Sequence, residues 1–330
     1  MIITKTPYRV SFFGGGSDYP EYYMNHGGAV LAASIDKYCY ISCRELPPFF
    51  SHKYRIAYSS IETVRNIEEI RHPAVKGVFK HLNIENGLEI QHHGDLPARS
   101  GLGSSSSFTA GLLKAFHVLS GNRISNYELA LETIHVEQNV IREIVGSQDQ
   151  MTVALGGLNH IEFRQDGVIK VYPLNISPER IQAFNNHLLL FFTGTSRNSQ
   201  EITKIKIKKI KTKITEVAHL KSMVAEAMSV LTSNSSITEI GKLLHEGWIA
   251  KRALSSNIST QLVDDIYQAA RDNGALGGKL LGAGGGGFVL LFARPEDHPK
   301  ICDSLSSLVR VPFKFEFNGS TVCLNEPGGL

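Results

Sequence analysis

The sequence predicts a mixed α and β protein that folds into two domains. β-rich segments such as "MIITKTPYRVSFF" at residues 1–13 are interspersed with long segments of helical periodicity, and no repeat of fixed length occurs. A chain of 330 residues can build two hydrophobic cores. The best boundary follows a predicted hairpin near residues 185–195, so we expect domains at 1–188 and 189–330.

The predicted elements alternate between strands and helices. Residues 1–13 form a strand, a Gly-rich loop with a short helical piece follows, and residues 29–45 give one or two strands. The segment "GLEIQHHGDLP" is another strand, and "QDG" joins the two strands of the hairpin. Hydrophobic spacing predicts helices at 61–83, 104–120, 126–145, 200–231, 236–256 and 260–273. We expect "GGKLLGAGGGG" to be a loop before a strand, and "FKFEFN" and "TVCLNE" to be strands near the end of the chain.

Composition excludes several classes of function. Hydrophobic residues make up 42% of the chain and charged residues 20%, as in soluble globular proteins, and the net charge of +3 argues against nucleic acid as a partner. No apolar run approaches the ~20 residues of a membrane span. We interpret the lysine-rich "KIKIKKIKTKI" as a solvated helix face rather than a membrane or nucleic-acid patch. Four cysteines without CxxC spacing indicate reduced thiols and a cytoplasmic location.

The segment "DLPARSGLGSSSSFTAGLLKAF", residues 95–116, is predicted to bind phosphate. Gly101 and Gly103 allow close approach of a bulky anion, and the following serines open an apolar helix whose first N–H groups are unpaired and partly positive. Serines cap such helix ends well and add hydroxyl donors. The alternative is a Gly-rich turn with a serine cap, for which one serine is enough.

The residues in this loop do not match three common phosphate-binding motifs. Ser104 stands where a Walker loop has lysine, Ser106 stands where a dinucleotide fingerprint has its third glycine, and the HRD and DFG segments of protein kinases do not occur. The loop therefore lacks a lysine of its own. The charge of the phosphates must be neutralised by a metal and by residues elsewhere.

Two downstream carboxylates are candidates for the chemistry. Glu137 lies at the edge of an apolar stripe that runs along helix 126–145 to Ile144, where a cation such as Mg²⁺ would compensate for burial; the alternative is a charge on a solvated face. Asp149 follows a predicted cap at Ser147 in a second short helix, where it could accept or orient a hydroxyl proton. The alternative is a carboxylate that only matches the helix dipole.

Glycines recur at two further places. In "TPYRVSFFGGGSD", three glycines after the predicted strand indicate close approach by a ligand or a neighbouring segment, and Arg9 among apolar neighbours suits phosphoryl oxygens. The alternative is a tight turn with a salt-bridged arginine. "LLGAGGGGFVLLFA" at 280–293 could be a bulge, a turn, or the support that lets another loop pack closely.

These three segments resemble, in order and across residues 6–292, the signatures of the GHMP small-molecule kinases. "TPYRVSFFGGGSD" resembles the first motif, "LPARSGLGSSSS" the phosphate-binding second and "KLLGAGGGGFVLLF" the third. The resemblance implies a GHMP kinase fold of the α+β class. Its N-terminal ATP-binding domain would be of the ribosomal-protein-like α/β type and its C-terminal domain ferredoxin-like, with ATP and substrate meeting between them.

The resemblance also implies roles for single residues. Ser105 and Glu137 match the Mg²⁺ ligands, Asp149 the carboxylate that faces the reacting hydroxyl, and Arg9 the arginine near the transferred phosphoryl group. The family usually has SSA where this loop has SSSS. The ATP phosphates would lie on Ser100, Gly101, Leu102, Gly103, Ser104, Ser105 and Ser106, and the sugar on Gly15, Gly16, Ser17 and Asp18.

Within the family, "RVSFFGGGSDYPEYY" and "GGAVLAASIDKYCYI" look like the bacterial D-glycero-D-manno-heptose 7-phosphate kinases, with fucokinase-type domains next. This implies an ATP- and Mg²⁺-dependent kinase that phosphorylates the anomeric hydroxyl of that heptose to the 1,7-bisphosphate, for nucleotide-activated heptose and surface glycans such as capsule or lipopolysaccharide. The alternatives are a fucose-type 1-kinase that acts on an unphosphorylated sugar and a non-catalytic ATP- or sugar-binding protein.

The segment "TGTSRNSQEI" suggests a contact for the sugar phosphate. Arg197 among hydroxyl side chains suits a phosphate monoester, and the alternative is a polar loop that caps the next helix. We therefore expect a small sugar phosphate and ATP as partners, without nucleic acid or membrane. A homodimer is one assembly that the sequence leaves open.

Overall fold

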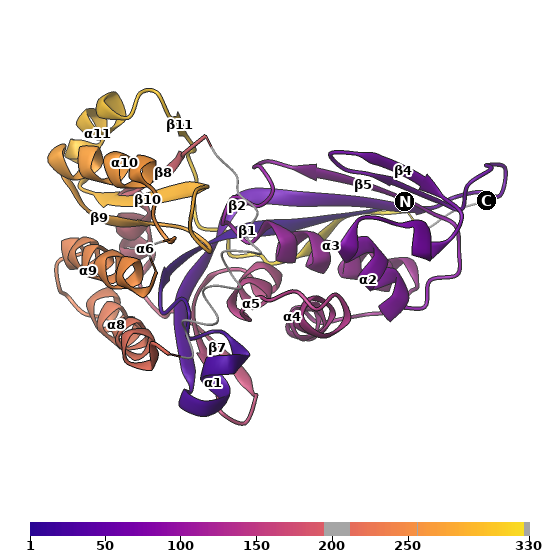
Figure 1. Ribbon diagram of the computed structural model, residues 1–330, viewed down its shortest axis with the longest axis horizontal. Coiled ribbons are helices and arrows are strands. Elements are labelled where there is room, and N and C mark those ends of the chain that lie inside the picture. Colours follow the sequence, from indigo (N-terminus) through magenta and orange to yellow (C-terminus); the bar gives the residue numbers. More distant parts are fainter. Residues whose placement is uncertain (195–211, 256, 327–330) are drawn as a thin grey trace.

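Two β-sheets, each covered by helices, build the structure, a computed structural model that describes residues 1–194, 212–255 and 257–326 (Figure 1). The first part of the chain contains β1 (Ile2–Phe13), α1 (Pro20–His26), β2 (Gly28–Glu45), β3 (Tyr54–Ala57), β4 (Ile61–Val64), α2 (Pro73–His81), β5 (Leu88–Gly94), α3 (Ser104–Leu119), α4 (Asn126–His135), α5 (Gln148–Leu155), β6 (Leu158–Phe163), β7 (Ile169–Pro173) and α6 (Pro178–Asn186). The rest contains β8 (Leu188–Phe192), α8 (Ile214–Thr232), α9 (Thr238–Leu254), α10 (Gln261–Asp272), β9 (Ala275–Leu280), β10 (Phe288–Ala293), α11 (His298–Ser304), β11 (Val309–Arg310) and β12 (Thr321–Asn325).

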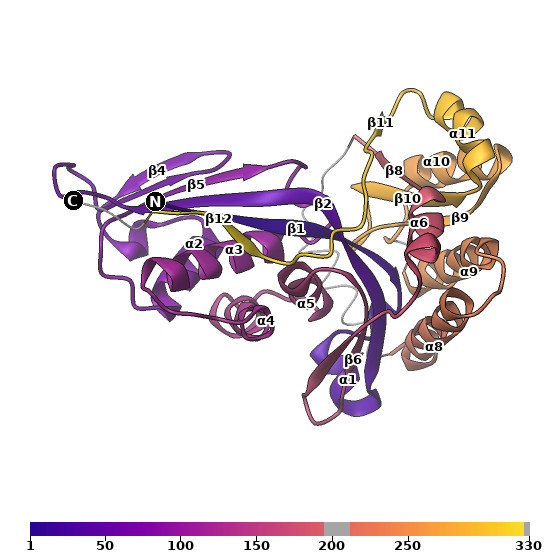
Figure 2. The ribbon, with the colours of Figure 1, turned by 180° about the vertical axis from the view of Figure 1, so that it is seen from behind.

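The first sheet is organised around the long antiparallel pair β1 and β2. Its strand order is β12-β1-β2-β5-β3-β4, and β6 joins β2 to β7. Helices α2, α3, α4 and α5 lie together along one face of this sheet (Figure 1), and the view from behind shows β12 beside β1 (Figure 2). Helix α3 packs on β1 and β2 through buried apolar side chains such as Leu112 and Leu113, so the start of α3 is held rigidly.

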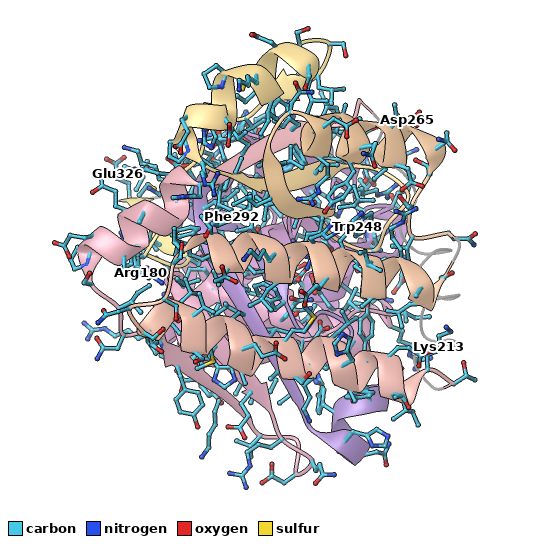
Figure 3. All side chains as sticks on the ribbon, turned by 90° about the vertical axis from the view of Figure 1, so that its left-hand side faces the viewer. Arg180, Lys213, Trp248, Asp265, Phe292 and Glu326 are labelled. Atoms are coloured by element: carbon cyan, nitrogen blue, oxygen red, sulfur yellow. The ribbon has the colours of Figure 1, made fainter. Side chains whose placement is uncertain are left out.

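The second sheet has the strand order β11-β8-β10-β9 and is covered by α9 and α10, while α8 packs on α9 and against β1 and β2 of the first sheet. Strand β10 is buried along its whole length, because it lies between two neighbouring strands and under helices. Figure 3 looks onto the outer side of this half, where α8 and α9 run side by side with Trp248 on α9. Strand β8 begins at the predicted boundary of 188 and 189, but β12 returns to pair with β1 in the first sheet.

Several predicted elements are correct in place and differ in type or length. Residues 61–83 are not one helix, because Ile61–Val64 pairs with β3 and the helix starts only at Pro73, a residue suited to a first helical turn. The first residues of the expected loop 277–287 are not loop, because residues 277–280 belong to strand β9, which pairs with β10 and packs on helix α9. The segment "FKFEFN" is not a strand and makes a single bridge, from Phe315 to Ile35.

The predicted helix 126–145 is interrupted where the site begins. Helix α4 ends at His135 and continues as one π-helical turn, Val136–Val140, after which Arg142 takes a positive φ of 61°. Ile144, expected in the apolar stripe, is 39% exposed because the helix has ended before it. π-Helical turns occur often at functional sites, and this one carries Glu137.

Candidate active site

A cavity of about 540 Å³ lies between the two halves of the molecule. Its wall takes residues from the end of β1, the loop into α3 and the start of α5 on one side, and from α8, α9 and the loop after β9 on the other. The predicted site residues on this wall are Arg9, Gly15, Asp18, Gly101, Gly103, Ser104, Ser105, Ser106 and Asp149. The topology therefore brings parts of all three glycine-containing segments to one cavity.

Arg9 and Asp149 form a two-point ion pair in this cavity. The Nε and Nη2 atoms of Arg9 donate to Oδ1 and Oδ2 of Asp149 at 2.8 and 2.7 Å, and Nη1 donates to the Gly101 carbonyl at 2.5 Å. Arg9 is 4% exposed, whereas the Asp149 side chain is 26% exposed. The buried arginine thus fixes both the carboxylate and the phosphate-loop backbone, and the carboxylate keeps access to the cavity.

The four serines at the start of α3 have separate tasks. Ser104 Oγ accepts from the Arg99 N–H at 3.0 Å, and Ser107 Oγ donates to the carbonyls of Pro7 and Gly103 at 2.8 and 3.1 Å. Ser105 and Ser106 both point to Glu137. The prediction of a serine cap is wrong, because Gly103 with a φ of 75° is the N-cap and makes no side-chain cap bond.

Glu137 is completely buried behind the serine loop. Its carboxylate accepts from Ser106 Oγ at 3.0 Å, from Gln150 Nε2 at 2.5 Å and from Ser105 Oγ at 3.5 Å. Burial, and next the nearby charge of Glu143, raise the pKa of Glu137 to about 8. The alternative that Glu137 is a charge on a solvated face is therefore wrong.

Glu143 brings a second carboxylate to the same place and lies on the cavity wall. Burial raises its pKa, and the charge of Arg99 and a hydrogen bond from Ser105 oppose that shift. Two carboxylates around one serine hydroxyl favour a bound cation, because a cation lets both ionise. The oxygens of these two carboxylates and of the Ser105 hydroxyl are hard ligands, which suit an Mg²⁺ ion that also binds nucleotide phosphates. Within the described residues, no group of three or more His, Cys, Asp or Glu side chains is arranged to hold a metal by itself.

The sugar-binding prediction falls on a loop that is held from several sides. Asp18 accepts from the Gly16 N–H at 2.8 Å and from Gln148 Nε2 at 3.0 Å, while Gln148 Oε1 accepts from Ser11 Oγ at 2.7 Å. A side chain at Gly146 would lie 1.9 Å from Oδ2 of Asp18, so Gly146 is needed for this approach. The carboxylate of Asp18 is thus fixed before any substrate arrives.

Some predicted site residues do not reach the cavity wall. Ser17 is fully buried and bonds the carbonyls of Gly14 and Ala29 at 2.8 and 2.9 Å. Ser100 bonds the Pro97 carbonyl at 2.6 Å. The cavity wall also leaves out Gly16, Leu102 and Glu137. Arg197 lies outside the described residues.

The third glycine-containing segment supports the phosphate loop. A Cβ atom on Gly282 would lie 2.5 Å from Gly101 Cα, and one on Gly287 would lie 2.2 Å from the Ser100 carbonyl oxygen. Both glycines have positive φ, of 76° and 112°. The two loops can touch only because side chains are missing at their contact, which is the close packing that the sequence suggested.

No role was predicted from the sequence for four charged residues that line the cavity, Arg99, Glu143, Lys251 and Lys279. Arg99 and Lys279 lie within the second and third motif segments, and their positions next to the glycines were the available signal. Glu143 and Lys251 belong to no motif. Gln148 and Gln150, on either side of Asp149, were also missed, because nothing in the sequence shows what an amide contacts.

The fold and this site define the class of protein, an ATP-dependent sugar kinase. The chain belongs to the GHMP kinase family, since the family's N-terminal domain matches residues 69–157 and its C-terminal domain matches residues 226–310. Its GHMP kinase fold and α+β class therefore agree with the prediction.

Two relatives and one solved structure are similar to this chain. The chain is 30% identical over 308 residues to D-glycero-alpha-D-manno-heptose 7-phosphate kinase of Campylobacter jejuni, covering 89% of this chain and 90% of that protein. It is 26% identical to the bifunctional fucokinase/GDP-fucose pyrophosphorylase of Arabidopsis thaliana over 90% of this chain and 30% of that protein. A solved D-glycero-D-manno-heptose 1-phosphate kinase from Bacteroides thetaiotaomicron has the same fold, with a TM-score of 0.80, 24% identity and coverage of 98% and 99%.

Among the helices that the structure describes, none is both long and apolar enough to span a bilayer.

Proposed function

We propose that this kinase transfers the γ-phosphoryl group of ATP to the anomeric hydroxyl of D-glycero-D-manno-heptose 7-phosphate and so makes the 1,7-bisphosphate. The observation that carries the proposal is the joint position of the serine loop and the Arg9–Asp149 pair in one cavity. The 30% identity to a heptose 7-phosphate kinase supports the choice of sugar. We also propose that the enzyme is cytoplasmic and that its product is used to make nucleotide-activated heptose for surface glycans.

The serine loop would bind the ATP phosphates. The first N–H groups of α3 are unpaired by helix geometry and carry partial positive charge, and Gly101 and Gly103 keep the approach open. Ser105 and Glu137, with Glu143 beside them, would hold Mg²⁺. When bound, Mg²⁺ would neutralise part of the charge of the ATP phosphates.

Asp149 would accept or orient the proton of the anomeric hydroxyl. Its carboxylate is exposed to the cavity and fixed by two bonds to Arg9, so little reorganisation is needed when the hydroxyl arrives. The Arg9 guanidinium would also stabilise charge near the transferred group. An anomeric hydroxyl is more acidic than an ordinary alcohol, so the base need not be strong.

Asp18 would grip hydroxyls of the sugar. Gln148 and the Gly16 N–H hold its carboxylate at the cavity wall, which favours recognition of one sugar orientation. Arg197 remains a proposed contact for the distal phosphate of the sugar.

A panel of acceptors tests the proposal. ADP formation is measured with heptose 7-phosphate, free heptose, mannose and fucose at saturating ATP and Mg²⁺. The proposal expects the highest kcat/KM for heptose 7-phosphate. Preference for fucose would support the fucose-type 1-kinase that the Arabidopsis similarity also suggests, and the absence of turnover with every acceptor would support a binding protein without catalysis.

A further inference from the structure

Ser11 is a polar side chain on the cavity wall for which no role was predicted from the sequence. It follows Arg9 by two residues on β1, and alternate residues of a strand face the same side, so the two side chains share one face of β1. They are about 7 Å apart along the strand, a distance comparable to a sugar ring with its hydroxyls. Ser11 is 6% exposed and lines the cavity.

The pairing of β1 with the start of α5 fixes where Ser11 lies. Arg9 binds Asp149, and Ser11 Oγ donates to Oε1 of the preceding residue, Gln148, at 2.7 Å. Two consecutive residues of α5 are therefore held by alternate residues of β1. If Asp149 faces the reacting hydroxyl, Ser11 lies next to the rest of the same sugar.

The hydrogen bonds around Gln148 run in one direction. Asp18 accepts from the Gly16 N–H at 2.8 Å and from Gln148 Nε2 at 3.0 Å. An ionised carboxylate only accepts, so Gln148 must turn its N–H group toward Asp18 and its oxygen toward Ser11. The hydroxyl proton of Ser11 is then committed to Gln148, and Ser11 Oγ can offer the cavity only its lone pairs.

These lone pairs lie in an open corner of the cavity. No group within the described residues donates to Ser11 Oγ, whereas a sugar presents several hydroxyl donors. Gly15 keeps the corner open, because a Cβ atom there would lie 3.8 Å from Ser11 Oγ and 3.9 Å from Gln148 Nε2. Ser11, Gly15, Gln148 and Asp18 all line the cavity.

We propose that Ser11 binds the acceptor sugar by accepting a hydrogen bond from one of its non-anomeric hydroxyls. Gln148 is a positioning residue, which fixes the direction of that bond and holds Asp18 beside it. The inference rests on the proposed function, since it needs a sugar whose anomeric hydroxyl faces Asp149. It does not need the phosphate of that sugar.

The experiment compares Ser11→Ala with the wild type, with heptose 7-phosphate or the sugar that the acceptor panel prefers. We expect KM for the sugar to rise about 3- to 20-fold, the effect of losing one hydrogen bond. The values of kcat and KM for ATP should stay nearly unchanged, because the lost contact is made equally before and during the reaction. Ser34→Ala is the matched control, since Ser34 also donates from a strand to α5, to the Thr152 carbonyl at 2.7 Å, but lies outside the cavity wall.

The hydroxyls of the acceptor give a second readout. The 2-, 3-, 4- and 6-deoxy forms of the sugar are each tested with the wild type and with Ser11→Ala. The form that lacks the partner of Ser11 should show the same KM with both proteins, while the others keep the difference. A difference that survives with every deoxy form, an unchanged KM for the sugar, or an equal rise in KM for ATP would overturn the inference. If the wild type phosphorylates no sugar, the proposed function itself is wrong and the inference falls with it.

Gln148→Met tests the positioning role. It should raise KM for the sugar, and in the double variant with Ser11→Ala the two increases should combine to less than their product, because Gln148 acts in part through Ser11. A fall in kcat with an unchanged KM for the sugar would show that Gln148 serves Asp149 instead.

Gly15→Ala keeps the inference testable if Ser11→Ala does not fold. Gly15 has no positive φ, and the added methyl group would make only ordinary contacts, so the fold should tolerate it. The methyl group would cover the oxygen of Ser11 without removing it, and calorimetric titration should show sugar binding weakened about fivefold or more. Unchanged sugar binding by this variant would contradict the contact.

Discussion

Arg9 and Asp149 lie 140 residues apart in the chain and meet in a two-point ion pair, with distances of 2.8 Å for Nε to Oδ1 and 2.7 Å for Nη2 to Oδ2. The pair joins strand β1 to the first turn of α5, and the same guanidinium also holds the Gly101 carbonyl. One arginine therefore links the proposed proton acceptor to the loop that would bind ATP.

Asp149→Asn should reduce kcat by ~10²–10⁴-fold, the usual contribution of a general base. The shape of the side chain is nearly unchanged, so KM for ATP should stay within a few-fold of the wild type. Steady-state kinetics with ATP and heptose 7-phosphate measure both values. A loss below tenfold would indicate that Asp149 only orients the hydroxyl, and a loss of ATP binding would indicate a structural role.

Because Arg9 and Asp149 act as a pair, their substitutions should not be additive. We expect Arg9→Met to lower kcat strongly and the double variant with Asp149→Asn to be little worse than either single one. Kinetics of the four proteins complete the cycle. If the loss of kcat in the double variant equals the product of the two single losses, the two side chains act independently.

Glu137→Gln tests the metal site. The new amide can be accommodated, because Oε1 of Gln150 is buried without a partner and can turn to accept a hydrogen bond. Turnover should fall steeply and the Mg²⁺ concentration for half-maximal rate should rise. Direct titration with Mn²⁺ in the presence of ADP provides a readout besides activity. Near wild-type turnover at low Mg²⁺ would contradict the assignment.

The raised pKa of Glu137 predicts how stability depends on pH in the absence of metal. In the folded protein the pKa is about 8, above the ordinary value of 4.5, so between these values the native state holds a proton that the unfolded state has lost. The free energy of unfolding should therefore decrease from pH 5 to pH 8. Glu137→Gln should show a smaller decrease in thermal denaturation over the same range, and identical pH profiles would refute a raised pKa.

Gly282→Ala tests the contact between the two glycine-containing loops. Besides the strain of a positive φ, its Cβ would lie 2.5 Å from Gly101 Cα, so the phosphate loop must move. We expect lower thermal stability and a clearly higher KM for ATP. Gly121→Ala is the control, since Gly121 has a similar φ of 73° and nothing within 4 Å of the added atom. It should show only the strain of about 1–2 kcal/mol. Equal KM values in the two variants would argue against loop support.

The sequence predicted the positions of the site segments better than their internal geometry. Glycines and serines at fixed spacing identify a loop before a helix, so Gly101 to Ser107 could be recognised from local chemistry. The Arg9–Asp149 pair and the burial of Glu137 depend on how distant segments pack. Amphipathic spacing continued smoothly through residues 136–145, so the π-helical turn could not be predicted from it. No motif contains Lys251, which joins Lys279 on the cavity wall only because α9 packs on β9.

The position of the new phosphate ester tests the central claim most directly. The product of ATP and heptose 7-phosphate is examined by ¹H–³¹P correlation NMR. The account predicts a second phosphate resonance coupled to the anomeric proton, on a sugar that keeps its original phosphate. A product phosphorylated at any other oxygen, or no product from this sugar while an unphosphorylated sugar is converted, would contradict the account.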